Sequence, residues 1–157
     1  MYRATREFIL ARQKHTSWKL TTPKVSQIGG GEPNRCFENA VKVMKASEAS
    51  DNKQIVMTGW IVQPFDKVNK CTAIIQHWWN ADLAGNQYDT TLLPDKSEYV
   101  HDIGLAEYHG KNLDRIDGNL AMSLLYQDGR FERLVDFEAM VFQPLNELRT
   151  DLLFKYK

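Results

Sequence analysis

The sequence predicts an α+β protein in which a helix that begins near a cysteine packs on an antiparallel β-sheet. Three observations lead to this class. A segment with helical periodicity follows three consecutive glycines at residues 29–31. Two runs rich in β-branched and aromatic residues, 54–63 and 71–79, are separated by a polar segment, and a third run, 87–92, follows a tight connection. A helix followed by strands that short turns join is typical of an antiparallel meander with a helix on it.

Length and net charge bound the function classes. The 157 residues fit a single domain, 1–157, which is long enough to bury a substantial core. Lys plus Arg equals Asp plus Glu at 20 each, so the formal net charge is zero. A general nucleic-acid binder carries a basic excess, and we therefore expect no general nucleic-acid binding.

The cysteines and the apolar runs indicate the compartment. Cys36 and Cys71 are too few for a disulfide framework, and their spacing matches no zinc motif, which favours a reducing compartment. No apolar run reaches the ~18 residues that a membrane-spanning helix needs, and the N-terminus lacks the apolar core of a secretory signal. We expect a cytoplasmic protein without a membrane segment.

The first third of the chain contains one well-marked helix. Residues 4–14 mix apolar and charged side chains and predict a short helix or strand, while residues 15–35 predict a loop. The helix starts at Arg35, with Asn34 as its N-cap, and ends over 47–50. Its apolar stripe consists of Cys36, Ala40, Val43 and Met44.

The middle of the chain predicts three antiparallel strands. Residues 54–63 and 71–79 form the first two, and a polar turn over 64–70 joins them. The second strand is apolar on both faces, which indicates a central position in the sheet. A connection over 81–86 leads to the third strand, residues 87–92.

The last third is more ambiguous. Asp128-Gly129 is a strong hairpin signal, although the good helix formers around it leave a helix over 119–126 as an alternative. The other predicted elements are a strand over 98–101, a helix with loops over 102–119, hairpin strands over 120–125 and 131–135, and a helix after Pro144.

Cys36 is the candidate nucleophile. A helix N-terminus carries a partial positive charge and free N–H groups, and both favour thiolate over thiol. Arg35, which precedes it, acts in the same direction. A nucleophilic thiol therefore belongs at this position. The alternative is that Cys36 is a small apolar residue on the buried stripe of the helix.

His77 and Asp89 are the candidate base and the carboxylate that orients it. In a hairpin centred on Leu83 these two residues lie directly opposite each other, with Cβ atoms about 5 Å apart. Asp89 then holds one ring nitrogen and leaves the other for Cys36. A register slip of one residue turns Asp89 away. The alternatives are a hydrogen-bonded core histidine and a carboxylate that accepts from local N–H groups.

Together these segments resemble the transglutaminase-like branch of the papain-like thiol enzymes. In that family a Cys opens a helix, a His follows in a strand within a run such as His-Ala-Trp, and an Asp follows in the next strand as Asp-Pro-Thr or Asp-Thr-Thr. The matching segments are Cys36-Phe37-Glu38-Asn39-Ala40, Gly59-Trp60, His77-Trp78-Trp79 and Asp89-Thr90-Thr91.

The resemblance covers residues 29–92, and residues 93–157 are then a C-terminal extension that completes the fold. Two features depart from the family pattern. Asp-Thr replaces the commoner Asp-Pro, and the segment between Cys36 and His77 is compressed. The chain as a whole also resembles small phage-encoded proteins.

The resemblance implies a papain- or transglutaminase-core-like fold and a thiol-dependent amide hydrolase or acyltransferase, that is, a protease, deamidase or transglutaminase-type enzyme. In this mechanism Cys36 attacks a carbonyl carbon, His77 moves the proton to the leaving amine and Asp89 fixes the ring. Backbone N–H groups at the helix start bind the oxyanion, and Gln27 is a candidate second donor by residue type. No cofactor or metal is implied, and the partner is a protein or peptide substrate.

Aromatic residues near these segments are candidate substrate contacts. Trp60 and Trp79 are the two candidates, although aromatic residues belong more often to a core. Trp78 and Trp79 point to opposite faces of one strand, so at most one of them lines a cleft.

Two further histidines compete with His77 as the base. His101 stands next to an aspartate, and His109 follows eight residues later. His77 is favoured because Trp79 and Asp89 fit the family pattern around it.

Two other functions stay open at this point. The first is a catalytically inactive papain-like scaffold that acts as a binding or inhibitor protein, for example on a host protein. The second, a metal hydrolase, needs more ligands than Cys36, His77 and Asp89 offer.

Overall fold

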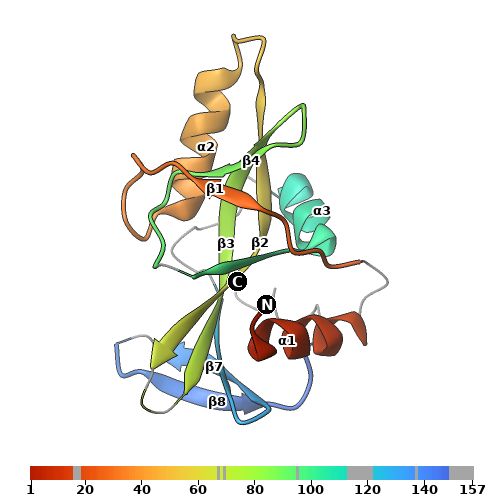
Figure 1. Cartoon of the computed structure of the whole chain (residues 1–157), viewed down its shortest axis with the longest axis vertical. Coiled ribbons are helices and arrows are strands. Elements are labelled where there is room, and N and C mark those ends of the chain that lie inside the picture. The colour runs from red at the N-terminus through yellow and green to blue at the C-terminus, as the bar shows by residue number, and fades with distance from the viewer. Residues whose placement is uncertain are drawn as a thin grey trace.

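The computed structural model combines three helices and eight strands in the part of the chain that it describes, residues 1–148 without 16–18, 67, 69, 95, 113–121 and 137 (Figure 1). The helices are α1 (Arg3–Gln13), α2 (Cys36–Ser47) and α3 (Ile103–Asn112). The strands are β1 (Val25–Gln27), β2 (Gln54–Asp66), β3 (Cys71–Asp82), β4 (Gln87–Asp89), β5 (Glu98–His101), β6 (Ser123–Gln127), β7 (Arg130–Asp136) and β8 (Val141–Leu145). The fold is mixed α/β with a core that is mostly sheet. No helix among these residues is long and apolar enough to cross a membrane.

The strands form one sheet around the long antiparallel hairpin of β2 and β3. These two strands pair from Gln54 opposite Asp82 to Asp66 opposite Cys71. β5 pairs with the other edge of β2, while β4 and β6 pair with the other edge of β3 near its two ends. β7 and β8 extend the sheet beyond β6, and β1 runs parallel to β4. The predicted central position of β3 is confirmed.

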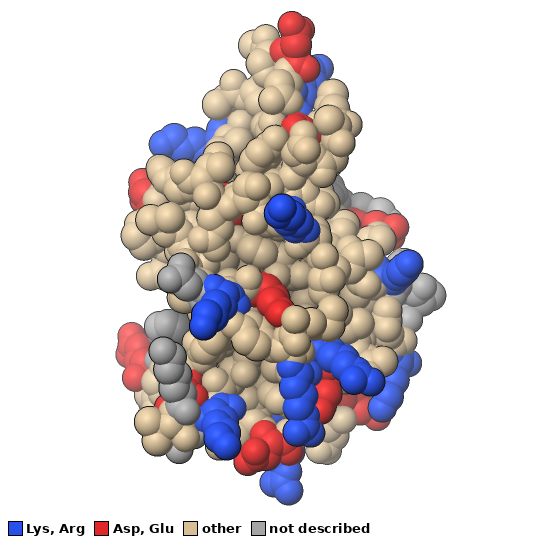
Figure 2. Space-filling model, in the orientation of Figure 1, with Lys and Arg blue, Asp and Glu red and all other residues tan. Residues whose placement is uncertain are grey.

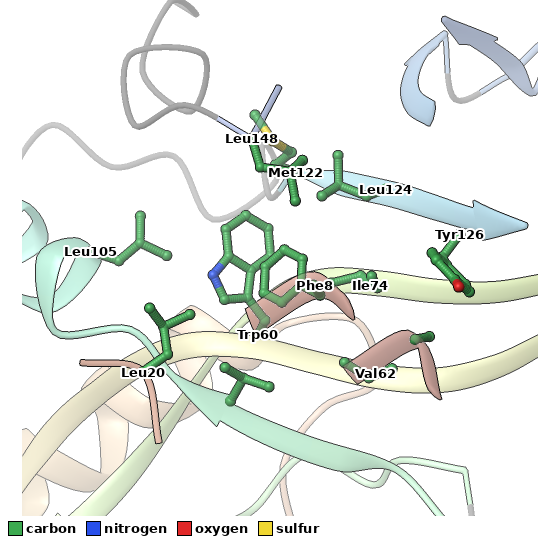
Figure 3. Close-up of a cluster of buried hydrophobic side chains, with 12 residues drawn as sticks. Phe8, Leu20, Trp60, Val62, Ile74, Leu105, Met122, Leu124, Tyr126 and Leu148 are labelled. Carbon is green, nitrogen blue, oxygen red and sulfur yellow. The ribbon is translucent and has the colours of Figure 1, made fainter. Parts of the chain in front are cut away.

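The main core lies on the face of the sheet that α1 and α3 cover (Figure 3). Phe8 of α1 meets Trp60 of β2 edge-on, with ring centroids 5.2 Å apart, and Leu105 of α3 belongs to the same cluster. Because side chains alternate between the two faces of a strand, the neighbours of these core residues point the other way. The smaller cluster on that opposite face contains Ile61, Trp79 and Tyr99.

Two predictions for the segment before α2 are wrong. Residues 15–35 contain β1, which is held by backbone pairing with β4 and has no apolar pattern of its own. The N-cap of α2 is Arg35 rather than Asn34, whose φ of 59° lies in the left-handed region. Asparagine tolerates that conformation better than most residues do, so Asn34 shapes the loop instead of capping the helix.

The predicted strands of the middle region are confirmed, with different ends. β2 continues through Pro64 to Asp66, so the turn after it is shorter than predicted. β3 continues to Asp82, while β4 stops at Asp89 because the chain there turns to bind α2. β5 coincides with the predicted strand over 98–101.

Beyond α3, the chain forms strands where a helix was an alternative. β6 and β7 form the hairpin around Asp128 and Gly129, and both turn residues have positive φ, which a helix does not allow. Pro144 lies within β8, opposite Glu132, so no helix begins directly after it. The helix predicted over 102–119 corresponds to α3; its predicted C-terminal part and residues 149–157 lie outside the described residues.

A buried ion pair joins α1 to the start of α3. The side chains of Arg12 and Asp102 are 1% and 0% exposed, and Arg12 Nε lies 2.9 Å from Asp102 Oδ2. The same oxygen accepts a hydrogen bond from Trp60, and Oδ1 accepts one from the Leu105 N–H. Within the described part of the chain the two terminal nitrogens of Arg12 are buried without a hydrogen-bond partner, so Asp102 compensates the guanidinium charge.

We expect Asp102→Ala to lower the free energy of unfolding by about 3–5 kcal/mol, because it leaves the charge of Arg12 buried without compensation. Urea unfolding followed by tryptophan fluorescence measures the change. Arg3→Ala is the matched control, since it removes an exposed ion pair with Glu7 on the same helix and should change stability little. If both substitutions lowered the free energy of unfolding equally, the buried Arg12–Asp102 pair would contribute no more to stability than the exposed Arg3–Glu7 pair.

Candidate active site

The loop before α2 places Cys36 at the start of a helix. Gly29 and Gly30 have φ angles of 68° and 90°, a backbone region that glycine enters without strain. Cys36 is the first residue of α2, and its side chain is half-buried. The first N–H groups of a helix have no partner within it, so the sulfur lies where a negative charge is favoured.

α2 packs against β3 around residues 77–79, where β2 is the one strand of the described part of the chain that pairs with β3. On the other edge of β3, β6 and the preceding Met122 bind the strand up to Gln76, and β4 pairs with it from Asn80 onward. The Phe37 ring meets the Trp78 ring edge-on, with centroids 5.4 Å apart, and Asn80 donates a hydrogen bond to the Ala40 carbonyl. The open edge leaves room for the first turn of α2 to approach the other face of the strand.

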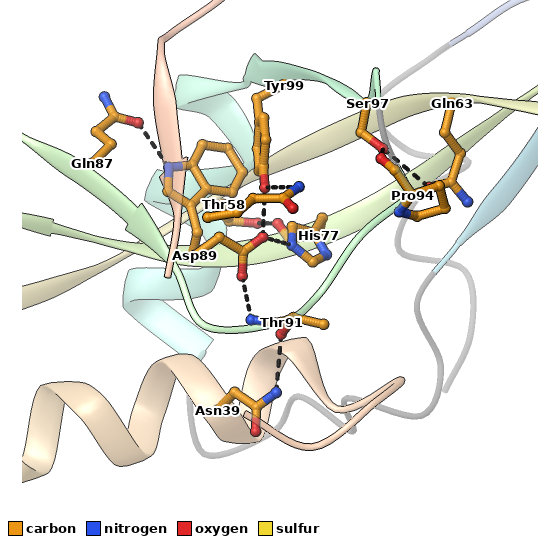
Figure 4. A network of polar contacts seen from close by, with 12 residues as sticks. Asn39, Thr58, Gln63, His77, Gln87, Asp89, Thr91, Pro94, Ser97 and Tyr99 are labelled. Atoms are coloured by element: carbon orange, nitrogen blue, oxygen red, sulfur yellow. Dashed lines mark hydrogen bonds and ion pairs between the residues drawn. The ribbon is translucent and has the colours of Figure 1, made fainter. Parts of the chain in front are cut away.

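His77 lies in this open stretch and is only 3% exposed. Its Nε2 lies 2.6 Å from Asp89 Oδ2, a short hydrogen bond between two buried groups (Figure 4). The Cys36 thiol lies close enough to the ring to interact with it and to raise the pKa of His77. Because Asp89 occupies Nε2, the nitrogen that faces Cys36 is Nδ1. The structure thus brings Cys36, His77 and Asp89 together.

The register that joins His77 to Asp89 differs from the predicted one. The observed pairs are Asn80 with Tyr88 and Ala81 with Gln87. The hairpin is therefore centred on Ala84 rather than on Leu83, and its ladder ends before His77. This change shifts the pairing by two residues, an even number, and so keeps Asp89 on the His77 face. The two side chains meet diagonally instead of directly across the strands.

Two further hydrogen bonds hold Asp89, and a third connects one of its partners to α2. Its Oδ2 accepts a hydrogen bond from the Tyr99 hydroxyl at 2.7 Å, in addition to the one shared with His77. Its Oδ1 accepts a hydrogen bond from the Thr91 N–H at 2.8 Å. Thr91 Oγ1 in turn accepts one from Asn39 Nδ2 at 2.9 Å, which connects the carboxylate segment to α2 (Figure 4).

These supporting residues are not identified by the sequence analysis. Asn39 carries one weak signal, because it is a poor helix former within the apolar stripe one turn after Cys36. Thr91 carries another, since it follows Asp89 at the spacing of a local side-chain-to-backbone hydrogen bond. Tyr99 carries none, because it reaches Asp89 only through the pairing of β5 with β2.

The contacts of His77 decide its charge. Burial lowers the pKa of His77, since it penalises the charged ring, but the hydrogen bonds with Asp89 and Cys36 raise it by more. The net effect raises the pKa of His77 from 6.5 to about 9, so the ring is an imidazolium at neutral pH. Burial and the charge of Asp89 raise the pKa of Tyr99, so its hydroxyl keeps its proton and donates it to the carboxylate.

Of the two competing histidines, His101 lacks these partners among the described residues. His101 lies on the same face as His77, with Gly59 of β2 between them, but its Nε2 is buried without a hydrogen-bond partner in the described part of the chain. Burial lowers the pKa of His101, and Asp102 only partly opposes this. Asp102 is already engaged by the ion pair with α1. His109 lies in α3, and its side chain is outside the described residues.

The structure buries Trp60 and Trp79, the two residues that were predicted to contact a substrate. Trp60 is fully buried in the main core, and its Nε1 donates a hydrogen bond to Asp102. Trp79 is 1% exposed and donates a hydrogen bond to Gln87 at 2.7 Å. Its ring is stacked beside that of His77, with centroids 6.3 Å apart. Trp79 therefore packs beside the site from inside the protein, whereas Trp60 belongs to the core on the opposite face of the sheet.

Gln27 lies on the Asp89 side of the site. It is paired with Asp89 through β1 and β4, and its Nε2 lies 3.4 Å from the Tyr99 hydroxyl. Its role as an oxyanion donor stays a prediction. Gln27 and Tyr99 also line a groove of about 550 Å³ between β1 and the segment before β5, to which Lys24 and Lys96 contribute.

The comparisons with known proteins identify no relative. No protein-family model, no curated protein and no solved structure matches the chain. Among the described residues, no group of three or more His, Cys, Asp or Glu side chains is arranged to hold a metal ion. The function is therefore argued from the chemistry of the site.

We expect the His77 ring to stay protonated through neutral pH and to lose its proton as the pH rises through about 9. The folded pKa exceeds the ordinary 6.5, so the imidazolium contributes stability that is complete below about pH 6.5 and is lost on the way to pH 9. ¹⁵N NMR of the ring nitrogens follows the titration. Asp89→Asn should lower the midpoint, because it removes the hydrogen bond to the charged form. A neutral ring at pH 7 in the wild type would contradict this charge assignment.

Proposed function

We propose that the protein is a thiol-dependent amide hydrolase or acyltransferase that uses Cys36, His77 and Asp89. One observation carries the proposal: a half-buried thiol at a helix start contacts a buried imidazole, whose other nitrogen is bound to a carboxylate at 2.6 Å. A nucleophile next to a base that a third group orients is the general arrangement of covalent acyl transfer.

The first half of the reaction uses the charge state of the pair. An imidazolium next to the sulfur favours the thiolate, which is the nucleophilic form. The Cys36 sulfur forms a bond to the amide carbon, and the carbonyl electrons move to the oxygen. His77 then gives its proton to the nitrogen as the carbon–nitrogen bond breaks, which releases an amine and leaves a thioester and a neutral ring. Asp89 keeps Nδ1 directed at the sulfur throughout.

The second half returns the enzyme to its starting state. The neutral His77 ring accepts a proton from water or from an acceptor amine as that molecule attacks the thioester carbon. The carbon–sulfur bond breaks, and the thiolate and the imidazolium are restored. Water as the acceptor yields a carboxylic acid, whereas an amine yields a new amide, so hydrolysis and transfer share every residue of the site.

The start of α2 is the proposed place for the oxyanion. Backbone N–H groups in the first turn of a helix, including that of Cys36, have no partner within the helix and stabilise negative charge. Gln27 is the proposed second donor, and this role requires its amide to leave the Tyr99 hydroxyl when a substrate binds.

The order and the contacts of the three residues support a papain-like or transglutaminase-like scaffold. A helix that starts at the thiol meets a histidine and an aspartate on neighbouring strands, as the resemblance implies. On this proposal the substrate is a protein or peptide amide, and the groove next to Gln27 and Tyr99 receives part of it.

The surface is consistent with a partner other than nucleic acid. On the face shown in Figure 2, basic side chains are interspersed with acidic ones. Such a face does not form the continuous basic surface that a phosphate backbone requires. We propose a cytoplasmic site of action, where a free thiol stays reduced.

A binding or inhibitor protein on the same scaffold is the second candidate. The observation that favours it is the burial of His77 and Asp89, at 3% and 1% exposure, which also suits a purely structural ion pair. The two candidates differ in the reactivity of Cys36, because a structural role requires no thiolate.

We expect iodoacetamide to label Cys36 at pH 7 about tenfold or more faster than an ordinary exposed thiol, because the thiolate reacts and an imidazolium stabilises it. His77→Ala should remove most of this advantage. Mass spectrometry of the labelled peptides separates Cys36 from Cys71, which is buried and has a pKa raised by that burial.

Cys71→Ser is the control for the assignment of the label and should leave the fast reaction in place. A Cys36 that reacts no faster than a model thiol, or that reacts equally fast in His77→Ala, would favour the binding protein over the enzyme.

A further inference from the structure

Asn39 lies one helical turn after Cys36, and its side chain makes three hydrogen bonds although the residue is only 7% exposed. Its Oδ1 accepts from the Glu32 N–H at 3.0 Å, and its Nδ2 donates to the Glu32 carbonyl at 2.8 Å. The same Nδ2 donates to Thr91 Oγ1 at 2.9 Å. One carboxamide thus binds the loop before the helix and the segment after the carboxylate.

The contacts of Asn39 complete a closed circuit of residues that runs through the site. Thr91 donates its N–H to Asp89, Asp89 binds His77, and His77 contacts Cys36. Cys36 and Asn39 are joined by one turn of α2, which completes the circuit. Because this circuit of contacts is closed, the distance between the Cys36 sulfur and the His77 imidazole depends on the hydrogen bond between Asn39 and Thr91 as well as on packing.

Gly31 shows how closely the loop approaches this carboxamide. A Cβ atom at this position would lie 2.6 Å from Asn39 Nδ2 and 2.9 Å from the Thr90 carbonyl oxygen. The Gly31 N–H donates to that same carbonyl at 3.0 Å. The loop, the helix and the segment after Asp89 therefore meet at one point, and Asn39 is the side chain that binds all three.

We propose that Asn39 is a positioning residue of the reaction, which holds the first turn of α2 at the distance from Asp89 that keeps Cys36 in contact with His77. The inference rests on the proposed function, since it assigns a role within the same site. Asn39 touches no reacting atom, and its effect passes through the placement of the helix and of Thr91.

Asn80 offers a matched control, because its side chain also makes a buried hydrogen bond to α2 but does not belong to the circuit of contacts. It is 1% exposed, and its Nδ2 donates a hydrogen bond to the Ala40 carbonyl of the same helix at 2.9 Å. Truncation of either asparagine leaves a buried polar group on α2 or on its neighbour without its partner, so both should lower stability. Only the side chain of Asn39 is connected to the segment after Asp89, because Asn80 pairs with Tyr88 of β4 through its backbone, which Asn80→Ala retains.

The test compares Asn39→Ala and Asn80→Ala by thermal unfolding and by the rate of iodoacetamide labelling of Cys36 from pH 5 to pH 10. We expect both variants to unfold at lower temperature. Asn39→Ala alone should slow labelling at pH 7 by about tenfold and move the half-maximal rate to higher pH, because a displaced sulfur loses the imidazolium. Asn80→Ala should keep the pH profile of the wild type.

Thr91 supplies a second pair of variants in case Asn39→Ala does not fold. Thr91→Val has nearly the same shape but lacks the oxygen that accepts from Asn39, and it keeps the backbone N–H that binds Asp89. We expect it to shift the pH profile in the same direction as Asn39→Ala, and Thr91→Ser, which restores the hydroxyl, to return it toward the wild type.

The outcomes separate this inference from the proposed function. A wild-type Cys36 that labels no faster than a model thiol would remove the proposed function itself. A fast wild-type thiol whose pH profile is unchanged in Asn39→Ala or in Thr91→Val would leave the function standing and overturn the positioning role. If the pH profile of labelling shifted equally in Asn39→Ala and Asn80→Ala, Asn39 would have only a general structural role.

Discussion

The hydrogen bond between His77 and Asp89 imposes the strongest constraint on this structure, because both groups are almost fully removed from water. A buried carboxylate is costly unless hydrogen bonds replace its hydration. The fold provides them through the Tyr99 hydroxyl of β5 and through the N–H of Thr91, two residues after Asp89. The hydrogen bond and the charge of Asp89 in turn raise the pKa of His77 and hold the proton on its ring. The reactive pair and the supporting hydrogen bonds form one unit.

The unpaired stretch along one edge of β3 explains how the start of α2 reaches the His77–Asp89 pair. A fully paired strand exposes only its two faces, and α2 packs on the face opposite to His77 through Phe37 and Trp78. Because neither β6 nor β4 pairs with residues 77–79, the helix start can reach past that edge. The interruption of the sheet is thus what allows Cys36 to contact the ring.

The protein contains two buried acid–base pairs with different consequences. Asp102 binds Arg12, whose guanidinium cannot lose its proton at any ordinary pH, so this pair only joins α1 to the sheet and to α3. Asp89 binds a histidine, whose proton can move. Although His101 stands beside Asp102 in the sequence, that carboxylate faces the arginine. The basic partner of each carboxylate therefore decides its role: the arginine makes the Asp102 pair structural, and the histidine allows the Asp89 pair to take part in proton transfer.

By itself the sequence determined the local elements and the reactive residue types. Helical spacing after Cys36, the apolar runs of β2 and β3 and the Asp-Gly turn of the β6–β7 hairpin all act over a few neighbouring residues. Tertiary structure alone decided β1, the strand character of Pro144, the centre of the β3–β4 hairpin and the support from Tyr99 and Asn39. Each of these depends on hydrogen bonds between segments that the chain folds together, and no local pattern records which distant donor a buried acceptor will meet.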